Sequence, residues 1–289
     1  MKDQSSEFEK IVASIPKIGV DWHREKLLEN SRRNLHQIKK SKSVDSLEEI
    51  STEKGLVISA GPSLNGGDAL EILFNPESRP PLIAVDASLV KCLKAGIVPD
   101  YVVTLDPHPT RMVRWFGDPD FLDNSRDDDY FKRQDLNVDF REDSEREAQD
   151  IIRLVDQYAH RIKLVIASTV SENLVARVVD AGFELYWWVP LVDDPDDDQS
   201  LTREMSRLTG LPAFNTGGNV GSAAWVFTQF WLKIRKPAVI GMDLGYPQKT
   251  PYEMTQTYPE LQRLLNKVRI EAEFFPETVF SQTGEVFFT

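Results

Sequence analysis

Residues 55–64, GLVISAGPSL, join a short apolar run to a turn of small residues. Leu56, Val57 and Ile58 form an unbroken apolar run, which is typical of a strand covered on both faces of a parallel sheet. In the turn, Gly61 permits backbone dihedral angles that other residues resist, and the small neighbours would let a phosphate or sugar approach the backbone. The stretch therefore predicts a strand followed by a candidate ligand-binding turn. An ordinary strand-to-helix turn without a ligand explains this stretch equally well.

Three later apolar runs also predict buried strands, and an aspartate ends or closely follows each of them. These runs are residues 81–86 (PLIAVD), 101–106 (YVVTLD) and 237–241 (PAVIG). Ligands of open parallel sheets bind outside the carboxyl ends of the strands, so a carboxylate in this position is well placed to be functional. Capping of a helix or turn is the alternative, and it carries more weight for the first carboxylate than for the second. The candidates are Asp86, Asp106 and Asp243.

A second glycine turn lies in residues 214–222, FNTGGNVGS. Asn215 and Thr216 can donate or accept hydrogen bonds, and Gly217 and Gly218 leave the backbone accessible. A strongly apolar helix is predicted to follow, and its N-terminal amides would favour an anion such as a phosphate. As a bare pattern the turn is weak evidence, because it is neither a Walker loop nor a G-x-G-x-x-G turn.

The loop after Asp106 contains a candidate catalytic histidine. Residues 107–111, PHPTR, form a stiff stretch with polar side chains. His108 lies on the predicted ligand edge, where an imidazole could take a proton from an acceptor hydroxyl. A surface or structural role is the stronger alternative for an isolated histidine. The candidate catalytic residues are Asp106, His108 and Asp243.

Metal binding has less support. Residues 193–198, DDPDDD, contain a D-x-D pattern, which can hold a divalent metal on a sugar nucleotide. In a chain with 46 acidic residues, chance occurrence in a solvated loop is the stronger explanation. A clustered Cys/His site is excluded, because the chain has one cysteine and four scattered histidines. Mg²⁺ stays open as a cofactor, and no metal ligand is assigned.

Composition narrows the classes of partner and compartment. The formal net charge of -12 argues against general binding of nucleic acid or anionic membranes, although a local basic pocket for a phosphorylated small molecule is compatible with it. The single cysteine, Cys92, allows no intrachain disulfide and makes a reducing cytoplasm the simplest setting. No stretch approaches the roughly 20 apolar residues of a membrane helix, and the N-terminal residues lack the apolar core of a signal peptide.

The remaining sequence predicts further elements of an α/β domain. Residues 163–167 and 183–189 predict two more strands, and Thr169 with Glu172 predicts the cap of the helix between them. Residues 117–143 are acidic and irregular, which suggests an insertion or lid.

Four segments together resemble one protein family: SAGPSL, AVDASLVKCLKAGIVPDYVVTLDP, NTGGNVGSAAW and VIGMDLGYP. Their order and wording are similar to the family that includes the archaeal 6-hydroxymethylpterin diphosphokinases and the motility-associated flagellin glycosyltransferases. The G-P-S-L turn also resembles that of bacterial sialyltransferases that use a cytidine-monophosphate sugar. The resemblance covers residues 55–247 and implies a Rossmann-like domain with a nucleotide or nucleotide-sugar site.

Carried over by position, the resemblance implies two groups of site residues. One group would surround the reacting group and consists of the three strand-terminal aspartates. The other would bind the phosphate or nucleotide and consists of Gly61, Pro62, Ser63, Asn215, Gly217, Gly218 and Asn219. The departures from the family are that Pro107 and His108 replace the richer acidic pattern of the pterin kinases, and that neither His108 nor His160 aligns with the sialyltransferase base. Combined with the residue-level analysis, the nucleotide-binding candidates are Gly61, Pro62, Ser63, Asp86, Asn215, Thr216, Gly217, Gly218 and Asn219.

The expected fold is α/β and Rossmann-like, with a mostly parallel sheet, helices on both faces and a helical N-terminal extension. The expected segments are a helical extension and linker over residues 1–54, a nucleotide or nucleotide-sugar binding domain over 55–250, and a C-terminal helix and strand over 251–289. The last residues, EVFFT, have the composition of a strand with no closing segment, so we expect a shortened chain or a tail that needs a partner.

The leading functional hypothesis is a cytoplasmic glycosyltransferase that moves a sugar from a nucleotide donor to an acceptor hydroxyl. The alternatives are a Mg²⁺- and ATP-dependent transferase similar to 6-hydroxymethylpterin diphosphokinase, and a nucleotide-binding module without catalysis. The expected partners are a nucleotide or nucleotide sugar and an acceptor that the sequence does not identify. The N-terminal extension and the apolar last helix also favour self-association.

Overall fold

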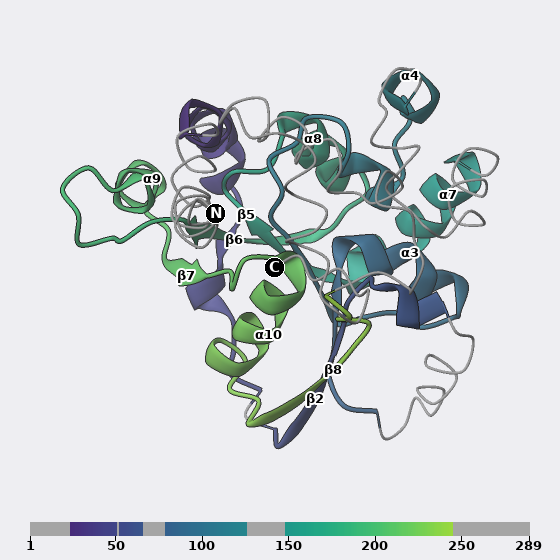
Figure 1. Ribbon diagram of the computed structural model, residues 1–289. Helices are drawn as coiled ribbons and strands as arrows, with labels where there is room; N and C mark the ends of the chain where they lie inside the picture. Colours follow the sequence, from purple (N-terminus) through teal and green to yellow (C-terminus); the bar gives the residue numbers. More distant parts are fainter. Residues whose placement is uncertain (1–23, 51, 66–78, 126–147, 245–289) are drawn as a thin grey trace, which may run out of the picture.

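The computed structural model describes residues 24–50, 52–65, 79–125 and 148–244 (Figure 1). Its centre is a sheet in the order β1-β6-β5-β4-β3-β2-β8, with β7 paired to β6, and all the recorded pairs are parallel. The strands are β1 (Lys42–Ser43), β2 (Lys54–Ile58), β3 (Leu82–Val85), β4 (Tyr101–Thr104), β5 (Lys163–Ala167), β6 (Glu184–Leu191), β7 (Ala213–Asn215) and β8 (Lys236–Ile240).

Helices cover both faces of this sheet. In Figure 1, α10 lies on one side of β2 and β8, whereas α3 and α7 lie on the other. The helices are α3 (Asp86–Lys94), α4 (Phe121–Ser125), α7 (Ala148–Tyr158), α8 (Glu172–Asp180), α9 (Leu201–Thr209) and α10 (Val220–Phe230), with a further helix over 24–38. The mostly parallel α/β fold and the N-terminal helix expected from the sequence are confirmed. None of the helices in the described ranges is long and apolar enough to cross a membrane.

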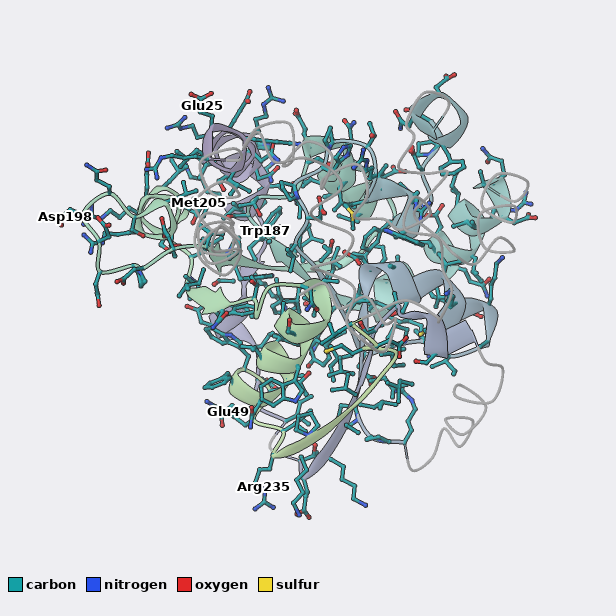
Figure 2. All side chains as sticks on the ribbon, viewed as in Figure 1. Glu25, Glu49, Trp187, Asp198, Met205 and Arg235 are labelled. Atoms are coloured by element: carbon teal, nitrogen blue, oxygen red, sulfur yellow. The ribbon has the colours of Figure 1, made fainter. Side chains whose placement is uncertain are left out.

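The strands form because their residues suit a sheet covered on both faces. Every residue of β3 and β4 is buried, and so are four of the five residues of β2 and of β5. Runs of this kind, without polar alternation, are what parallel strands require. Trp187 and Trp188 of β6 complete the interior, and Figure 2 shows Trp187 inside the molecule while Asp198 projects at its periphery.

Two strands and one helix start differ from the sequence-based expectation. Strand β1 lies within the stretch that the sequence analysis assigns to a linker, and β7 lies at the start of the second glycine turn. The predicted cap of α8 is wrong by two residues, because Ser171 is the N-cap and its Oγ accepts a hydrogen bond from the Leu174 amide at 3.3 Å. Thr169 instead lies buried in the preceding loop. Most of the predicted acidic insertion, and the predicted last helix and final strand, lie outside the described residues.

The order of the strands creates a topological switch point. From β2 the sheet grows through β3, β4, β5 and β6 in one direction, and β8 is then added on the opposite side of β2. In open α/β sheets, ligands bind outside the carboxyl ends of the strands where this direction reverses. The turns that follow β2 and β8 are therefore the expected position of a ligand site.

Candidate nucleotide site at the carboxyl edge of the sheet

The turns after β2 and β8 continue to pair beyond the sheet. The Ser59 amide donates to the Ile240 carbonyl at 2.9 Å, and the Gly61 amide donates to the Gly241 carbonyl at 2.7 Å. A Cβ atom on Gly61 would lie 2.7 Å from that same carbonyl oxygen, and one on Gly241 would lie 2.7 Å from the Ser59 carbonyl oxygen. Glycine is required at both positions because the two backbones approach too closely for a side chain.

Asp243 fastens these two turns together. The Ser63 amide donates to Oδ2 of Asp243 at 2.8 Å, and the Ser63 hydroxyl donates to Oδ1 at 2.5 Å. Both residues are exposed, so the contact lies at the surface of the carboxyl edge. Asp243 thus lies at the switch point, as its position after β8 predicts, and both its carboxylate oxygens already accept hydrogen bonds. Its proposed catalytic role stays a prediction.

The N-terminus of α10 meets both turns. Asn219 is the N-cap of this helix, and its Oδ1 accepts a hydrogen bond from the Ser222 amide at 2.9 Å. A Cβ atom on Gly221 would lie 2.7 Å from the Ser59 hydroxyl oxygen and 3.2 Å from the terminal methyl of Met242. Three segments far apart in the sequence therefore converge, and we call residues 59–63, 219–222 and 241–243 the switch-point site.

The amides at the start of α10 suit an anion. Within the described part of the chain, no acceptor is recorded for the amides of Val220 and Gly221. The first amides of a helix have no partner inside the helix, and the helix dipole adds partial positive charge there. A phosphate at this end of α10 would satisfy those amides.

The second glycine turn lies beside this helix end and is held by its own side chains. The Gly217 amide donates to Oδ1 of Asn215 at 2.8 Å, and the Gly218 amide donates to Oγ1 of Thr216 at 3.3 Å. Both glycines have positive φ angles, +62° and +93°, which side-chain-bearing residues rarely adopt. The predicted polar residues thus shape the turn, and their roles toward a nucleotide stay predictions.

Asp86 lies in the interior behind the carboxyl edge. Its side chain accepts hydrogen bonds from the Ala87 amide at 2.7 Å and from the Thr104 hydroxyl at 2.8 Å, and the residue is only 1% exposed. Burial raises the pKa of this carboxyl to about 7, although the two hydrogen bonds oppose the shift and the charge of Asp106 adds to it. Asp86 therefore joins the ends of β3 and β4.

The pKa of Asp86 predicts a pH-dependent stability. Because the pKa is about 7 in the folded chain and near 3.8 otherwise, the folded state binds more protons between these values, and stability falls as the pH rises toward 7. Asp86→Asn keeps the shape and removes the titration, so its stability relative to wild type should be about 3 kcal/mol more favourable at pH 8 than at pH 5. Urea unfolding at both pH values measures this difference, and an equal difference at the two values would contradict it.

Asp106 and His108 lie together in residues 105–111, which we call the β4 loop. The His108 amide donates to Oδ1 of Asp106 at 2.7 Å, and Nδ1 of His108 accepts from the Thr110 and Arg111 amides at 3.3 and 3.2 Å. A neutral imidazole whose Nδ1 accepts carries its proton on Nε2. In this arrangement His108 presents a donor, and Asp106 is the better placed group to accept a proton.

Neighbouring elements hold the β4 loop through its carbonyl groups. The donors come from the N-terminal helix, from the loop after β5 and from α8, so the loop is fixed from several directions. A loop held in this way can present its side chains in one arrangement before a ligand binds. The bonds join Asn30 Nδ2 to the Pro107 oxygen (3.3 Å), Thr169 Oγ1 to the Leu105 oxygen (3.4 Å) and Asn173 Nδ2 to the Pro109 oxygen (3.2 Å).

The sequence analysis missed the contribution of the N-terminal helix. Partial burial lowers the pKa of Lys26, the charge of Asp106 raises it and the charge of Arg111 lowers it, so these three side chains are electrostatic neighbours. The spacing of residues within the helix shows which of its faces is apolar. That spacing does not indicate that Lys26 would be an electrostatic neighbour of a loop 80 positions later in the chain.

The candidate residues thus fall into two groups on one edge. The switch-point site lies at β2 and β8, whereas the β4 loop lies two strands beyond β2, or about 10 Å at the usual strand spacing. The D-x-D segment belongs to neither group, because Asp194 and Asp197 accept hydrogen bonds from the amides of Asp196 and Gln199 and so close local turns. Within the described ranges, no group of three or more His, Cys, Asp or Glu side chains could hold a metal ion.

Comparison with known proteins gives a similar solved structure and a family match. The chain has 15% identity, with a TM-score of 0.46, to the structure of the MAf glycosyltransferase from Magnetospirillum magneticum AMB-1; the match covers 78% of this chain and 29% of that one. No curated protein sequence matches the chain. Residues 29–120 match the family model described as 6-hydroxymethylpterin diphosphokinase MptE-like, which confirms the expected resemblance over those residues.

Proposed function

We propose that this chain binds a nucleotide sugar at the switch-point site and transfers the sugar to an acceptor hydroxyl. The observation that carries the proposal is the convergence of the turns after β2 and β8 with the N-terminus of α10 at Gly221, at the carboxyl end of a parallel sheet. This arrangement offers backbone amides and a helix dipole to a phosphate group. The match of residues 29–120 to a family named for a diphosphokinase is consistent with a transferase that uses a nucleotide.

The side chains of the β4 loop would supply the chemistry. Asp106 would accept the proton of the acceptor hydroxyl as the hydroxyl attacks the sugar carbon. His108, with its proton on Nε2, would donate a hydrogen bond to the acceptor and hold its hydroxyl beside Asp106. The amides at the start of α10 would stabilise the negative charge that develops on the departing phosphate. Asp243 would keep the two turns of the switch-point site in register through Ser63.

Diphosphate transfer from ATP is the second candidate. The family match favours it, because the matched residues include the first glycine turn, Asp86 and Asp106. That reaction would require Mg²⁺ to neutralise charge on the phosphates and would release AMP. A sugar transfer would instead release the nucleotide of the donor, so product analysis separates the two reactions.

Thermal unfolding with a panel of nucleotides and nucleotide sugars, with and without Mg²⁺, tests the proposal. A ligand at about 100 times its Kd should stabilise the fold by roughly 2.7 kcal/mol. Stabilisation by a cytidine or uridine sugar supports sugar transfer, and stabilisation by ATP only with Mg²⁺ supports the second candidate. Saturable binding without turnover of any panel member would indicate a binding module, and a flat panel would overturn the site.

Charge at Thr216 provides a sharper test of the site. Thr216→Asp and Thr216→Asn can both accept the hydrogen bond from the Gly218 amide that Thr216 accepts, so both should preserve the turn. Only the aspartate adds a negative charge near the helix end that is proposed to hold phosphate. We expect the aspartate variant to bind the nucleotide at least about tenfold more weakly than the asparagine variant. Equal affinities, measured by calorimetric titration, would remove the glycine turn from the site.

A further inference from the structure

The amino edge of the sheet contains a cavity that the proposed function does not use. Its volume is about 540 Å³, within the range of roughly 300–1,000 Å³ that is usual for small-molecule sites. Tyr101 and Lys163, the first residues of β4 and β5, contribute to its lining. The cavity is therefore about 15 Å, the length of these strands, from the carboxyl edge on which the switch-point site lies. The lining residues are Ile50, Arg79, Pro80, Pro81, Asp100, Tyr101, Arg161 and Lys163.

Positive side chains predominate in this lining. Three of the lining residues are cations, and one, Asp100, is a carboxylate. Oδ2 of Asp100 accepts from Nη1 of Arg79 and from the Leu82 amide, both at 2.8 Å, and Oδ1 accepts from Nη2 of Arg79 at 3.1 Å. Arg79 is thus neutralised within the wall, and the excess charge comes from Arg161 and Lys163. Such an excess is unusual in a chain with a net charge of -12.

Arg161 and Lys163 have no close counter-ion in the part of the chain that the structure describes. No carboxylate of that part lies within 4.0 Å of either side chain. Glu184 is opposite Lys163 in the sheet, but its Oε1 already accepts a hydrogen bond from Nζ of Lys42 at 2.5 Å. The Lys163 ammonium group lies over the Tyr101 ring instead, 5.4 Å from its centroid. Both cations can therefore bind an anion without first breaking an ion pair.

Tyr101 adds a buried hydroxyl group to the same cavity. The residue is 4% exposed, and its ring packs on Phe227 of α10 with the two centroids 5.5 Å apart. Among the described residues, its hydroxyl group has no hydrogen-bond partner. Burial raises the pKa of this phenol to about 12, so it keeps its proton and stays a donor at neutral pH. A buried donor without an acceptor is costly, and an oxygen atom of a ligand would satisfy it.

The rest of the lining is apolar. We call Ile50, Pro80 and Pro81 the apolar wall. The proline rings fix two of its backbone φ angles, so this wall is stiff. Small-molecule sites combine such walls with a few polar groups that fix the orientation of the ligand. The cavity is thus suited to a molecule with an anionic group at one end and an apolar body.

We propose that this cavity binds a small organic anion, one that carries a phosphate or a carboxylate group. Arg161, Lys163 and the Tyr101 hydroxyl group hold the anionic oxygen atoms, and the apolar wall contacts the body of the ligand. The planar fork of an arginine matches both kinds of anionic group. This site lies at the opposite end of the strands from the switch-point site, so the inference does not depend on the proposed function.

Binding of four probes to the full chain tests this site. Acetate, benzoate, inorganic phosphate and phenyl phosphate present each anionic group with and without an apolar ring, and calorimetric titration measures each Kd. We expect the aryl probe of one pair to bind saturably and at least about tenfold more tightly than the same anionic group alone. That pair identifies the anionic group. Benzamide has the ring without the charge and should not bind measurably.

Substitutions assign the binding to the three donors. Arg161→Gln and Lys163→Gln should each weaken binding of the aryl probe at least about tenfold, whereas Lys163→Arg should retain most of it. Tyr101→Phe should weaken binding at least about fivefold. It should leave the urea midpoint of the ligand-free chain unchanged, because no hydrogen bond of the hydroxyl group is lost. A hydroxyl group with only a structural role would lower the midpoint and leave the Kd unchanged.

Two further variants separate this site from general charge effects and from the switch-point site. Arg207→Gln removes an exposed positive charge of α9 outside the lining and should bind the probe as wild type does. Thr216→Asp should weaken nucleotide binding and leave probe binding unchanged. Three results overturn the inference: no saturable probe binding, no effect of Arg161→Gln and Lys163→Gln, or weaker probe binding in Thr216→Asp. Normal probe binding without any nucleotide binding refutes the proposed function alone.

Discussion

Replacement of Gly241 by alanine should cost about 3 kcal/mol of folding free energy or more and abolish stabilisation by nucleotide. The new Cβ atom would lie 2.7 Å from the carbonyl oxygen and 3.1 Å from the carbonyl carbon of Ser59. Both are backbone atoms of a turn that is hydrogen-bonded to β8, so neither can move without breaking those bonds. The positive φ of +69° adds a further cost of about 1–2 kcal/mol for any side chain. Urea unfolding measures the first effect and nucleotide titration the second.

Gly210→Ala is the matched control for this variant. Gly210 is the C-cap of α9 and has a φ of +73°, close to that of Gly241, but a Cβ atom added there would have no atom within 4 Å. Its substitution should cost about 1 kcal/mol, the strain of the backbone angle alone. The difference between the two variants therefore reports the close approach of the turns. Equal losses would mean that the approach at Gly241 is not tight.

Arg177→Met should destabilise the fold by about 3–4 kcal/mol. The Arg177 side chain is 5% exposed, and its Nε donates to the Phe116 and Gly117 carbonyls at 3.0 and 2.6 Å. Its Nη2 also donates to Asp156 at 2.6 Å. Removing one partner of a buried polar cluster leaves the others unsatisfied, which is the costly change. The lost contacts join α8 to the segment after β4, so the expected loss is global and measurable by urea unfolding.

Two comparisons separate burial from charge at Arg177. Arg177→Lys keeps the positive charge but not the planar fork, so its stability should lie between wild type and the methionine variant. Arg153→Met removes an ion pair with Asp150 in which the two side chains are 75% and 60% exposed, and it should change stability by less than about 1 kcal/mol. A loss at Arg153 as large as that at Arg177 would contradict the role given to burial.

The sequence predicts best the strands whose own residues form a buried apolar run. Residues 163–167 form β5 with the predicted bounds, because a short run of four buried apolar residues, two of them β-branched, is the length of a strand and too short for a helix. Strands β1 and β7 have two and three residues, and they exist because the edge of β6 accepts them. Pairing with a distant partner leaves no local pattern. The predicted cap of α8 is wrong because Thr169 and Ser171 are both residue types that suit an N-cap. Ser171 takes this role, whereas the carbonyl of Thr169 accepts a hydrogen bond from Asn30 in the preceding loop.

The candidate site also has features that the sequence predicts and features that it does not. That aspartates and glycine turns gather on one edge follows from the rule for parallel strands, and the sequence is sufficient to apply it. The bond between Ser63 and Asp243 joins residues 180 positions apart, so no local pattern encodes it. The burial of Asp86 and the position of Lys26 depend on how neighbouring elements pack. These are the features for which three-dimensional structure was needed.

Pairing of β1 with β6 has a consequence for synthesis of the chain. Lys42 is opposite Tyr186, so the first strand of the described ranges has its partner 144 residues later. At about 5–20 residues per second, the N-terminal helix and β1 would wait about 7–30 s for β6. During this interval β2, β3, β4 and β5 can already assemble, since each of these neighbouring strands follows the last in sequence. The segment that contributes Asn30 and β1 is thus made long before β6 and docks late.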